Sequence, residues 1–288
     1  MPTALPLPPI FLSHGSPLIA LEPGAAGRFM QRLGPAISAT FGRPRAIVAL
    51  SAHTLARQPV LLAAAQHAAV YDFGNFDPRL NALRYDVAGA PTLAQHVQAL
   101  LEAAGLSAQV APQGGLDHGI WTPLRYAWPD ADIPVLPLAW VPSDSPAAQF
   151  ALGQALAPLA REGVLVLGSG SITHNLRRVF DGGLQAEAKQ PEISESAAFR
   201  HWWLEHSAAR DWPALFDYRR QAPHALDMHP SDEHLLPWHI AAGAGGRAHA
   251  PLRLHDSVTY ACLGMDAYAF GPSAAVLVSA LTGATMAM

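Results

Sequence analysis

Five histidines lie where an apolar run, or the turn that follows one, comes to an end. His14 follows the run at residues 10–13, and His53 follows the run at residues 45–52. His118 and His174 lie in glycine-containing or serine-containing turns further along, and His234 lies in an acid-rich loop. Imidazole is the commonest metal ligand in proteins and the side chain best suited to proton transfer near neutral pH. These residues therefore predict metal binding together with acid–base chemistry.

The elements around these histidines predict an α/β fold. Continuous apolar runs such as residues 45–52 and 164–167 are typical of strands buried on both faces, and helical patterns alternate with them through residue 170. This alternation predicts a three-layer single domain, with a largely parallel or mixed central sheet and helices on both faces. Ligands of such sheets bind at the carboxyl ends of the strands. The histidines are therefore expected to converge on one mononuclear metal site.

Further elements are predicted from hydrophobic periodicity and from the positions of glycine and proline. Helices are expected at residues 23–38, 91–104, 120–128, 146–161, 196–209 and 231–242. Additional strands are expected at residues 59–65, 108–111, 133–140, 252–254, 258–263 and 274–281. In the helix at 231–242, Ser231 is expected to be the N-cap, so that His234 projects from the first turn.

Composition narrows the classes of partner. The 288 residues carry a formal net charge of −4 without a long basic run, which argues against nucleic acid and favours a small molecule. The one cysteine, Cys262, lies in an apolar stretch and predicts a buried inert thiol, and no cysteine pair is available for a structural zinc site. No secretion signal is recognised, and Gly271 and Pro272 interrupt the apolar end of the chain, so we expect no membrane span and a cytoplasmic location.

Three other chemistries lack their motifs. The turn Gly168-Ser169-Gly170-Ser171 follows a strand, but it has neither the spacing nor the lysine of a phosphate-binding loop. No dinucleotide fingerprint follows any strand. Ser16 and Ser169 are not part of a G-x-S-x-G elbow, which argues against a serine hydrolase.

One loop is unusually aromatic. Residues 71–78 have the glycine, asparagine, aspartate and proline content of a loop but contain three aromatic residues. Tyr71 and Phe73 in this loop, together with Trp121, are candidates for gripping the ring of an aromatic substrate. Ordinary packing against the core is the alternative for these three side chains.

Six short motifs occur in order along the chain. They are His14-Gly15-Ser16-Pro17, Ser51-Ala52-His53, Tyr71-Asp72-Phe73-Gly74, Asp117-His118-Gly119-x-Trp121, His174-Asn175-Leu176-Arg177 and Asp232-Glu233-His234-x-x-Pro237. The ordered set resembles the DOPA-dioxygenase-like branch of the class III (LigB-type) extradiol ring-cleavage dioxygenases. The resemblance covers about residues 10–271 of a single catalytic domain spanning 1–288, and it leaves 272–288 as a C-terminal extension.

The resemblance implies specific roles. His14, His53 and His234 would hold one metal, His174 would be the acid–base residue, and His118 would be a second pocket histidine that stabilises bound oxygen or a substrate oxyanion. Because Glu233 adjoins His234 and carboxylates also serve as third ligands, Glu233 is an alternative ligand. Thr54 replaces the more usual aromatic residue after the second histidine, so a differently shaped pocket wall is expected there. The implied reaction inserts O2 into a catechol-type diol, with Fe(II) for activity and Zn(II) possible in the isolated protein.

Two other functions use the same residues. A zinc-dependent hydrolase would activate hydroxide on three histidines, and a non-catalytic metal or small-ligand binding protein would keep a filled coordination shell. The identity of the diol, the ring bond cleaved and the choice between monomer and dimer are left open by the sequence.

Overall fold

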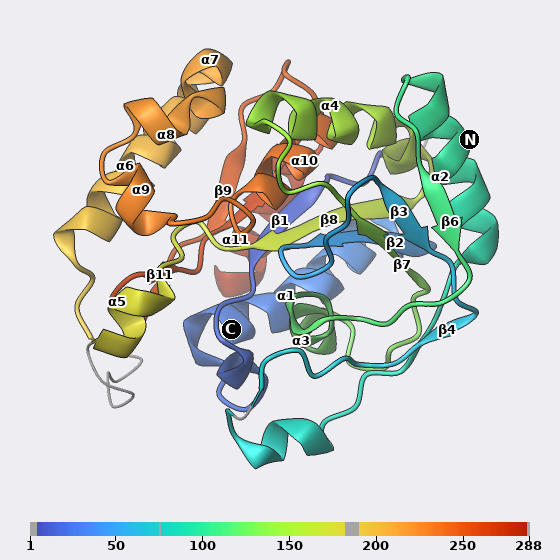
Figure 1. The fold of residues 1–288 in the computed structure, drawn as a ribbon, viewed down its shortest axis with the longest axis horizontal. Helices are drawn as coiled ribbons and strands as arrows, with labels where there is room; N and C mark the ends of the chain where they lie inside the picture. Colours follow the sequence, from blue (N-terminus) through green and yellow to red (C-terminus); the bar gives the residue numbers. More distant parts are fainter. Residues whose placement is uncertain (1–4, 75, 182–189, 287–288) are drawn as a thin grey trace.

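The computed structural model describes residues 5–74, 76–181 and 190–286. A mixed eight-stranded sheet forms the middle of the molecule (Figure 1). From edge to edge, its strands are β6 (Gln109–Ala111), β3 (Val60–Leu62), β7 (Val135–Ala139), β2 (Ala46–Ser51), β8 (Val164–Gly170), β1 (Ile10–Ser13), β12 (Ala267–Ala269) and β9 (Leu252–His255). Strands β7, β2, β8 and β1 are parallel, whereas β3 pairs with β7, β12 with β1, and β9 with β12 in antiparallel fashion.

Alternating side chains of the central strands enter two different hydrophobic layers. In β2, Ile47 and Ala49 join a cluster with α1 (Gly24–Phe41), α3 (His118–Ala127) and α11 (Ala274–Met286). Val48 and Leu50 point the other way, since successive strand residues alternate between faces. They join helices α2 (Pro91–Ala103), α4 (Pro146–Leu156) and α10 (Leu236–Gly245) (Figure 1). The predicted three-layer α/β fold with a mixed sheet is confirmed.

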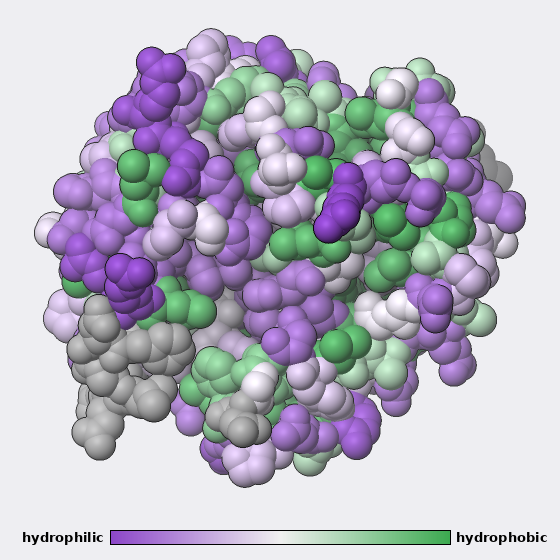
Figure 2. Space-filling view, viewed as in Figure 1, coloured by the Kyte–Doolittle hydropathy of each residue, from purple (hydrophilic) through white to green (hydrophobic). Residues whose placement is uncertain are grey.

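A third, aromatic-rich cluster lies beside the sheet. Its helices are α6 (Ser194–Ala209), α7 (Trp212–Phe216), α8 (Tyr218–Gln221) and α9 (Ala225–Met228). Trp203, Tyr218 and Trp238 are fully buried in it, and the ring of His239 packs against all three. Hydrophilic residues cover the outside of this region at the upper left of Figure 2, where Figure 1 shows α7 and α8.

The predicted strand at residues 274–281 is wrong, because this segment is the first part of helix α11 (Ala274–Met286). Ala274, Leu277 and Leu281 are buried, whereas Val276 is exposed. Burial three and four residues apart is helical spacing. The largely apolar run did not reveal this periodicity, because Ala275 and Val276, two of its three exposed positions, are also apolar. Residues 287–288 of the predicted C-terminal extension lie outside the described residues.

Two further boundaries differ from the prediction. The strand expected at 258–263 is a hairpin of β10 (Val258–Thr259) and β11 (Leu263–Gly264), because Tyr260 and Ala261 adopt positive φ angles of 50° and 60°. Ser231 does not cap a helix. Its hydroxyl donates to Glu233, and α10 starts only at Leu236.

The remaining described elements are short. They are η1 (Pro17–Ala20), β4 (Gln66–His67), η2 (Pro78–Ala82), β5 (Val87–Ala88), η3 (Ala157–Glu162) and α5 (Leu176–Asp181).

Cys262 is buried as predicted, and burial raises the pKa of its thiol to about 11, so the thiol form predominates at neutral pH. Within the described ranges, no helix is both long and apolar enough to cross a membrane.

Candidate metal centre and active site

The predicted histidines meet at one edge of the central sheet. β1 and β2 both run parallel to β8, on either side of it, so their carboxyl ends lie together and bring His14 and His53 side by side. The Nε2 atoms of these two rings are 3.1 Å apart. His118 begins α3, and its ring centroid lies 4.1 Å from that of His53. The ring of His234 lies 5.4 Å from that of His14, and His174 stacks on His234 at 3.4 Å.

One ligand atom from each of His14, His53 and His234 can be chosen so that all three lie within 4.8 Å of one another. Two overlapping groups satisfy the same criterion: His53 with Asp72 and His118, and His174 with Glu233 and His234. The structure therefore brings together all five predicted histidines and adds two carboxylates. This cluster is compatible with metal binding.

In His14 and in His234, one ring nitrogen forms a hydrogen bond to a residue outside the histidine cluster. This hydrogen bond determines which nitrogen of the ring faces the cluster. The Ser169 hydroxyl donates to the carbonyl of Gly119, so it accepts from Nδ1 of His14, 3.0 Å away. Nδ1 of His234 lies 3.1 Å from Glu233 Oε1, and a carboxylate can only accept. Nε2 of both rings is therefore left with its lone pair, and Nε2 of His234 is buried without a hydrogen-bond partner among the described residues. Metal-bound histidines show this pattern, so the residues fit a bound cation.

Four histidines of the cluster, His14, His53, His174 and His234, are held in their neutral form. Burial lowers the pKa of His14 and of His234 well below 6.5, and the neighbouring histidines lower it further. Burial, with a smaller effect of His118, lowers the pKa of His53 to about 4. Burial also lowers the pKa of His174 to about 3. Neutral imidazole is the form that binds metals, so these rings need not lose a proton to do so at pH 7.

Glycines let the backbone of the surrounding turns approach closely. Gly15, with φ of 65°, turns the chain directly after His14. A Cβ at Gly119 would lie 2.4 Å from the Ser51 hydroxyl and 3.0 Å from Nδ1 of His14. A Cβ at Gly170 would lie 2.0 Å from the carbonyl oxygen of His234, which accepts from the amide of Ser171. These contacts fix the backbone that carries His14 and His234.

Two acids support the loops that carry His53 and His118. Asp117 is buried and accepts from Ser51 at 2.6 Å and from Thr54. Burial raises the pKa of Asp117 despite these hydrogen bonds. Thr54 thus anchors the loop after β2 and is not among the described residues that line the cavity. Asp72 accepts from the backbone amide of His118 at 3.0 Å and from its ring Nδ1 at 2.9 Å, which fixes the orientation of that ring.

The histidine cluster opens into a cavity of about 860 Å³. Four of the five histidines line it, namely His53, His118, His174 and His234. Besides these and the acids, its wall includes the apolar side chains of Pro17, Leu18, Phe73, Phe76, Leu176, Val179 and Leu263. Phe73 therefore lies where the sequence predicted a ring-contacting residue. Tyr71 and Trp121 do not line the cavity but pack behind Phe73, with ring centroids 6.2 and 6.5 Å from its ring.

The different depths of these aromatic rings have a simple cause. The Tyr71 hydroxyl donates to the carbonyl of Leu83, and the indole N–H of Trp121 donates to the carbonyl of Val70. Both rings are therefore tied into the base of the loop, and Trp121 is fully buried. Trp121 thus packs in the core and Tyr71 supports the loop, which is the packing alternative that the sequence left open for both.

Sequence reasoning did not assign a role to Asp72, Ser169 or Asp117. Asp72 and Asp117 lie inside motifs that also contain His118 or aromatic residues. Their position beside candidate site residues was the sequence feature that could have indicated a role for them. Ser169 contacts His14 across a separation of 155 residues. Only the pairing of β1 with β8 brings these two residues together.

Comparisons with known proteins identify the family of this chain. Residues 8–271 match the family model described as the catalytic LigB subunit of aromatic ring-opening dioxygenase. A 4,5-DOPA dioxygenase extradiol from Beta vulgaris is 34% identical over 264 residues, which cover 90% of this chain and 95% of that protein. A protein of the same name from Portulaca grandiflora is 34% identical over 267 residues, which cover 90% of this chain and 94% of that protein.

A solved structure has the same fold. The crystal structure of an uncharacterized protein from Escherichia coli K12 aligns with a TM-score of 0.72 at 26% sequence identity. The alignment covers 92% of this chain and 100% of that chain.

Proposed function

Because the chain belongs to the LigB family of aromatic ring-opening dioxygenases and is an extradiol ring-cleaving enzyme, we propose that it opens a catechol-type diol at a site built on His14, His53 and His234. In this reaction both atoms of O2 enter the product and the carbon–carbon bond beside the diol breaks. The product is a ring-opened semialdehyde, and no external reductant is needed.

The observation that carries the proposal is the buried Nε2 of His234, which has no hydrogen-bond partner in the described part of the chain and lies close to the ligand atoms of His14 and His53. Fe(II) is the proposed cofactor, and what it supplies when bound is Lewis acidity toward the diol oxygens and electron exchange with O2. Glu233 is assigned to the outer hydrogen bond of His234 rather than to ligation, because its Oε1 lies beside Nδ1 of that ring.

We assign proton transfer to His174. Its neutral ring lines the cavity beside His234 and can accept a proton from a diol hydroxyl as the substrate binds. A diol anion next to the imidazole favours the protonated ring, which offsets the effect of burial on its pKa. The same ring can return the proton when the O–O bond breaks.

His118 is assigned to charge stabilisation. Nδ1 of the His118 ring donates to Asp72. A hydrogen bond from His118 to a negatively charged oxygen would therefore come from Nε2. Both ring nitrogens would then have to carry hydrogen. Phe73 and the other apolar wall residues would exclude water and contact the ring of the substrate.

Two histidine variants test the proposal. We expect His174→Ala to bind metal normally and to lose ring cleavage by about 10²–10⁴-fold, the usual effect of removing an acid–base group. His14→Ala should lose the metal as well as activity. The measurements are metal content after anaerobic Fe(II) loading, then O2 uptake and the yellow ring-opened product across a panel of catechols. His201→Ala, which removes a largely exposed histidine of α6, is the control and should match the wild type. Full activity in either active-site variant would contradict the assignment.

A further inference from the structure

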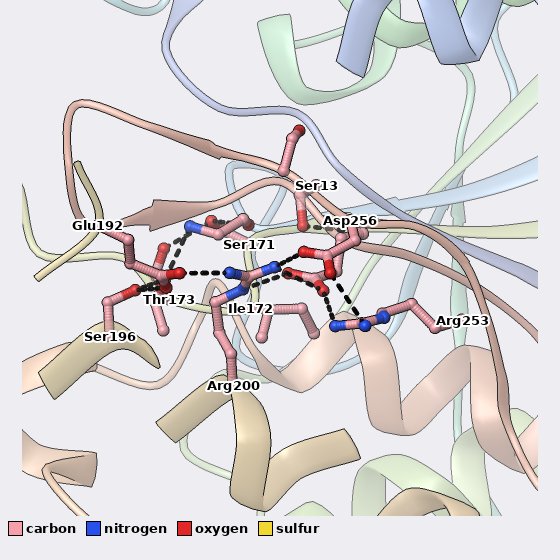
Figure 3. Close-up of polar contacts among 12 residues, drawn as sticks. Ser13, Ser171, Ile172, Thr173, Glu192, Ser196, Arg200, Arg253 and Asp256 are labelled. Carbon is pink, nitrogen blue, oxygen red and sulfur yellow. Dashed lines mark hydrogen bonds and ion pairs between the residues drawn. The ribbon is translucent and has the colours of Figure 1, made fainter. Parts of the chain in front are cut away.

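A buried arginine lies behind the histidine cluster. Arg200 on α6 is only 7% exposed and pairs with three acids, Glu192, Asp256 and Asp266 (Figure 3). Its Nε and Nη2 donate to the two carboxylate oxygens of Asp266 at 2.7 and 3.0 Å. This two-point pairing fixes the plane of the guanidinium relative to Asp266, which directly precedes β12.

One side of this network reaches the residue before His14. The carbonyl oxygen of Asp266 accepts from the hydroxyl of Ser13 at 2.8 Å and from its amide at 3.3 Å. Ser13 is the last residue of β1 and is fully buried. The position of Asp266 therefore bears directly on the end of the strand from which His14 projects.

The other side reaches the residue before His174. Glu192 accepts from Arg200 at 2.9 Å and from the hydroxyl of Ser196 at 2.7 Å. Because the Ser196 hydroxyl donates to Glu192, it accepts from the hydroxyl of Thr173, 3.4 Å away. Oγ1 of Thr173 in turn accepts from the amide of Gly264 at 2.7 Å. Figure 3 shows Thr173, Ser196 and Glu192 grouped on one side of Arg200.

Gly264 closes the network between these two sides. A Cβ at Gly264 would lie 2.8 Å from Oγ1 of Thr173 and 2.9 Å from Cδ of Arg200, so the arginine and the turn pack on the same backbone. Arg200, Glu192, Asp266, Ser13 and Thr173 are all absent from the described lining of the cavity. None of these five residues therefore contacts the contents of the cavity directly, and the network reaches the site through the segments that carry His14 and His174.

We propose that Arg200 is a positioning residue whose ion pairs, through Ser13 and Thr173, set the placement of His174 relative to His14. The inference rests on the proposed function for the role of His174. A displacement of about 1 Å of a reacting group can cost as much as 10²-fold in rate, so a buried anchor common to both histidine-bearing segments has catalytic value.

Variants of Thr173 test this link without removing the buried charge. Thr173→Val keeps the shape of the side chain but removes the hydroxyl, and we expect kcat to fall about 10-fold or more, with KM and metal content within about twofold of wild type. Thr173→Ser restores the hydroxyl and should recover most of the rate. Ser207→Ala is the matched control. Like Thr173, Ser207 is a fully buried hydroxyl residue; it lies on α6 and its hydroxyl has no hydrogen-bond partner among the described residues.

A second readout does not depend on turnover. In the zinc-loaded protein, the imidazole resonance of His174, assigned by its absence in His174→Ala, should shift in Thr173→Val and in Arg200→Lys but not in Ser207→Ala. Wild-type kcat and an unshifted resonance in Thr173→Val overturn the proposal, as does an equal loss of rate in Ser207→Ala. If His174→Ala itself cleaves the ring normally, the proposed function fails instead, and the two failures are thereby distinguished.

Discussion

At the scale of single residues, the ring nitrogen that each histidine offers is decided by the partner of its other nitrogen. His14 donates to Ser169, and His234 donates to Glu233. In both cases the hydrogen bond leaves Nε2 free to face the cluster. Carboxylates and hydroxyls behind metal-bound histidines commonly act in this way, by fixing the tautomer and the orientation of the ring.

This reasoning predicts the effect of Glu233→Gln. The amide oxygen of glutamine can still accept from Nδ1 of His234, but the negative charge is lost. We expect metal affinity to fall by about 10–100-fold, with activity recovered at saturating Fe(II). Titration of the metal-free protein measures the Kd. Glu205→Gln is the control, because Glu205 forms a comparable but exposed pair with His201. If Glu233→Gln binds no metal even at saturation, Glu233 is a ligand and our assignment is wrong.

The sequence predicted the candidate ligands better than it predicted the walls around them. His14 and His53 follow apolar strands directly, so the rule that strand ends share an edge was sufficient to bring them together. Tyr71 and Trp121 are aromatic residues in motifs of the same ordered set as Phe73, so residue type did not separate the three. The depth of each ring depends on loop carbonyls that accept their polar atoms, and no sequence pattern specifies those.

At the scale of elements, the position of His234 depends on how closely α10 and the turn before it approach β8. Gly168 and Gly170 of β8 face the carbonyl oxygens of Pro237 and His234, so close that a Cβ would lie 2.3 and 2.0 Å away. These neighbours are backbone atoms and cannot rotate aside. A side chain at either glycine must therefore move the strand or the turn.

We accordingly expect Gly170→Ala to lower the free energy of unfolding by about 1–3 kcal/mol, the usual cost of overpacking, and to weaken metal binding because the His234 turn is displaced. Urea unfolding and metal titration measure the two effects. Gly283→Ala in α11 is the control, since no atom lies within 4 Å of a Cβ there. That substitution should leave metal affinity unchanged and favour the helix. Unaltered metal affinity in Gly170→Ala would show that the close approach does not govern the site.

Helices and strands were predicted correctly where the length of a segment and its hydrophobic periodicity indicated the same element. The prediction was wrong where the periodicity indicated no single element. The helix at residues 91–104 was predicted within one residue of its end, because apolar residues such as Leu93, Val97 and Leu100 recur three or four positions apart. Residues 274–281 have apolar residues on the buried face and, at Ala275 and Val276, on the exposed face, so the pattern did not separate helix from strand. Strand β12 was missed because Ala267–Ala269 is only three residues long.

At the scale of the whole molecule, several histidines outside the proposed metal site are buried without charge. His229 and His239 are fully buried, and burial lowers the pKa of each to about 4. Hydrogen bonds to the carbonyls of Ile172 and Leu215 oppose this effect only in part. The native protein thus keeps both rings neutral at pH values where an unfolded chain binds protons.

The sign of the pH dependence follows from this difference. Between the ordinary value of 6.5 and about 4, the unfolded state holds a proton on each of these histidines and the native state does not, so stability falls as pH falls through this window. Above pH 6.5 both states are neutral and the contribution to the slope disappears. Each such histidine contributes a slope of about 1.4 kcal/mol per pH unit within the window.

Replacement of one of these histidines should reduce by one the number of protons that the chain takes up on unfolding in this pH window. In His239→Gln, the amide can still donate to the carbonyl of Leu215 but does not titrate. We expect the slope of unfolding free energy against pH, measured by urea unfolding of the metal-free protein between pH 6 and 4.5, to decrease by about 1.4 kcal/mol per pH unit. Phe216→Leu, which perturbs the same aromatic cluster without removing a titrating group, should lower stability and keep the wild-type slope. An unchanged slope in His239→Gln would mean that His239 is already protonated in the native protein, because only a ring that gains its proton on unfolding contributes to this dependence.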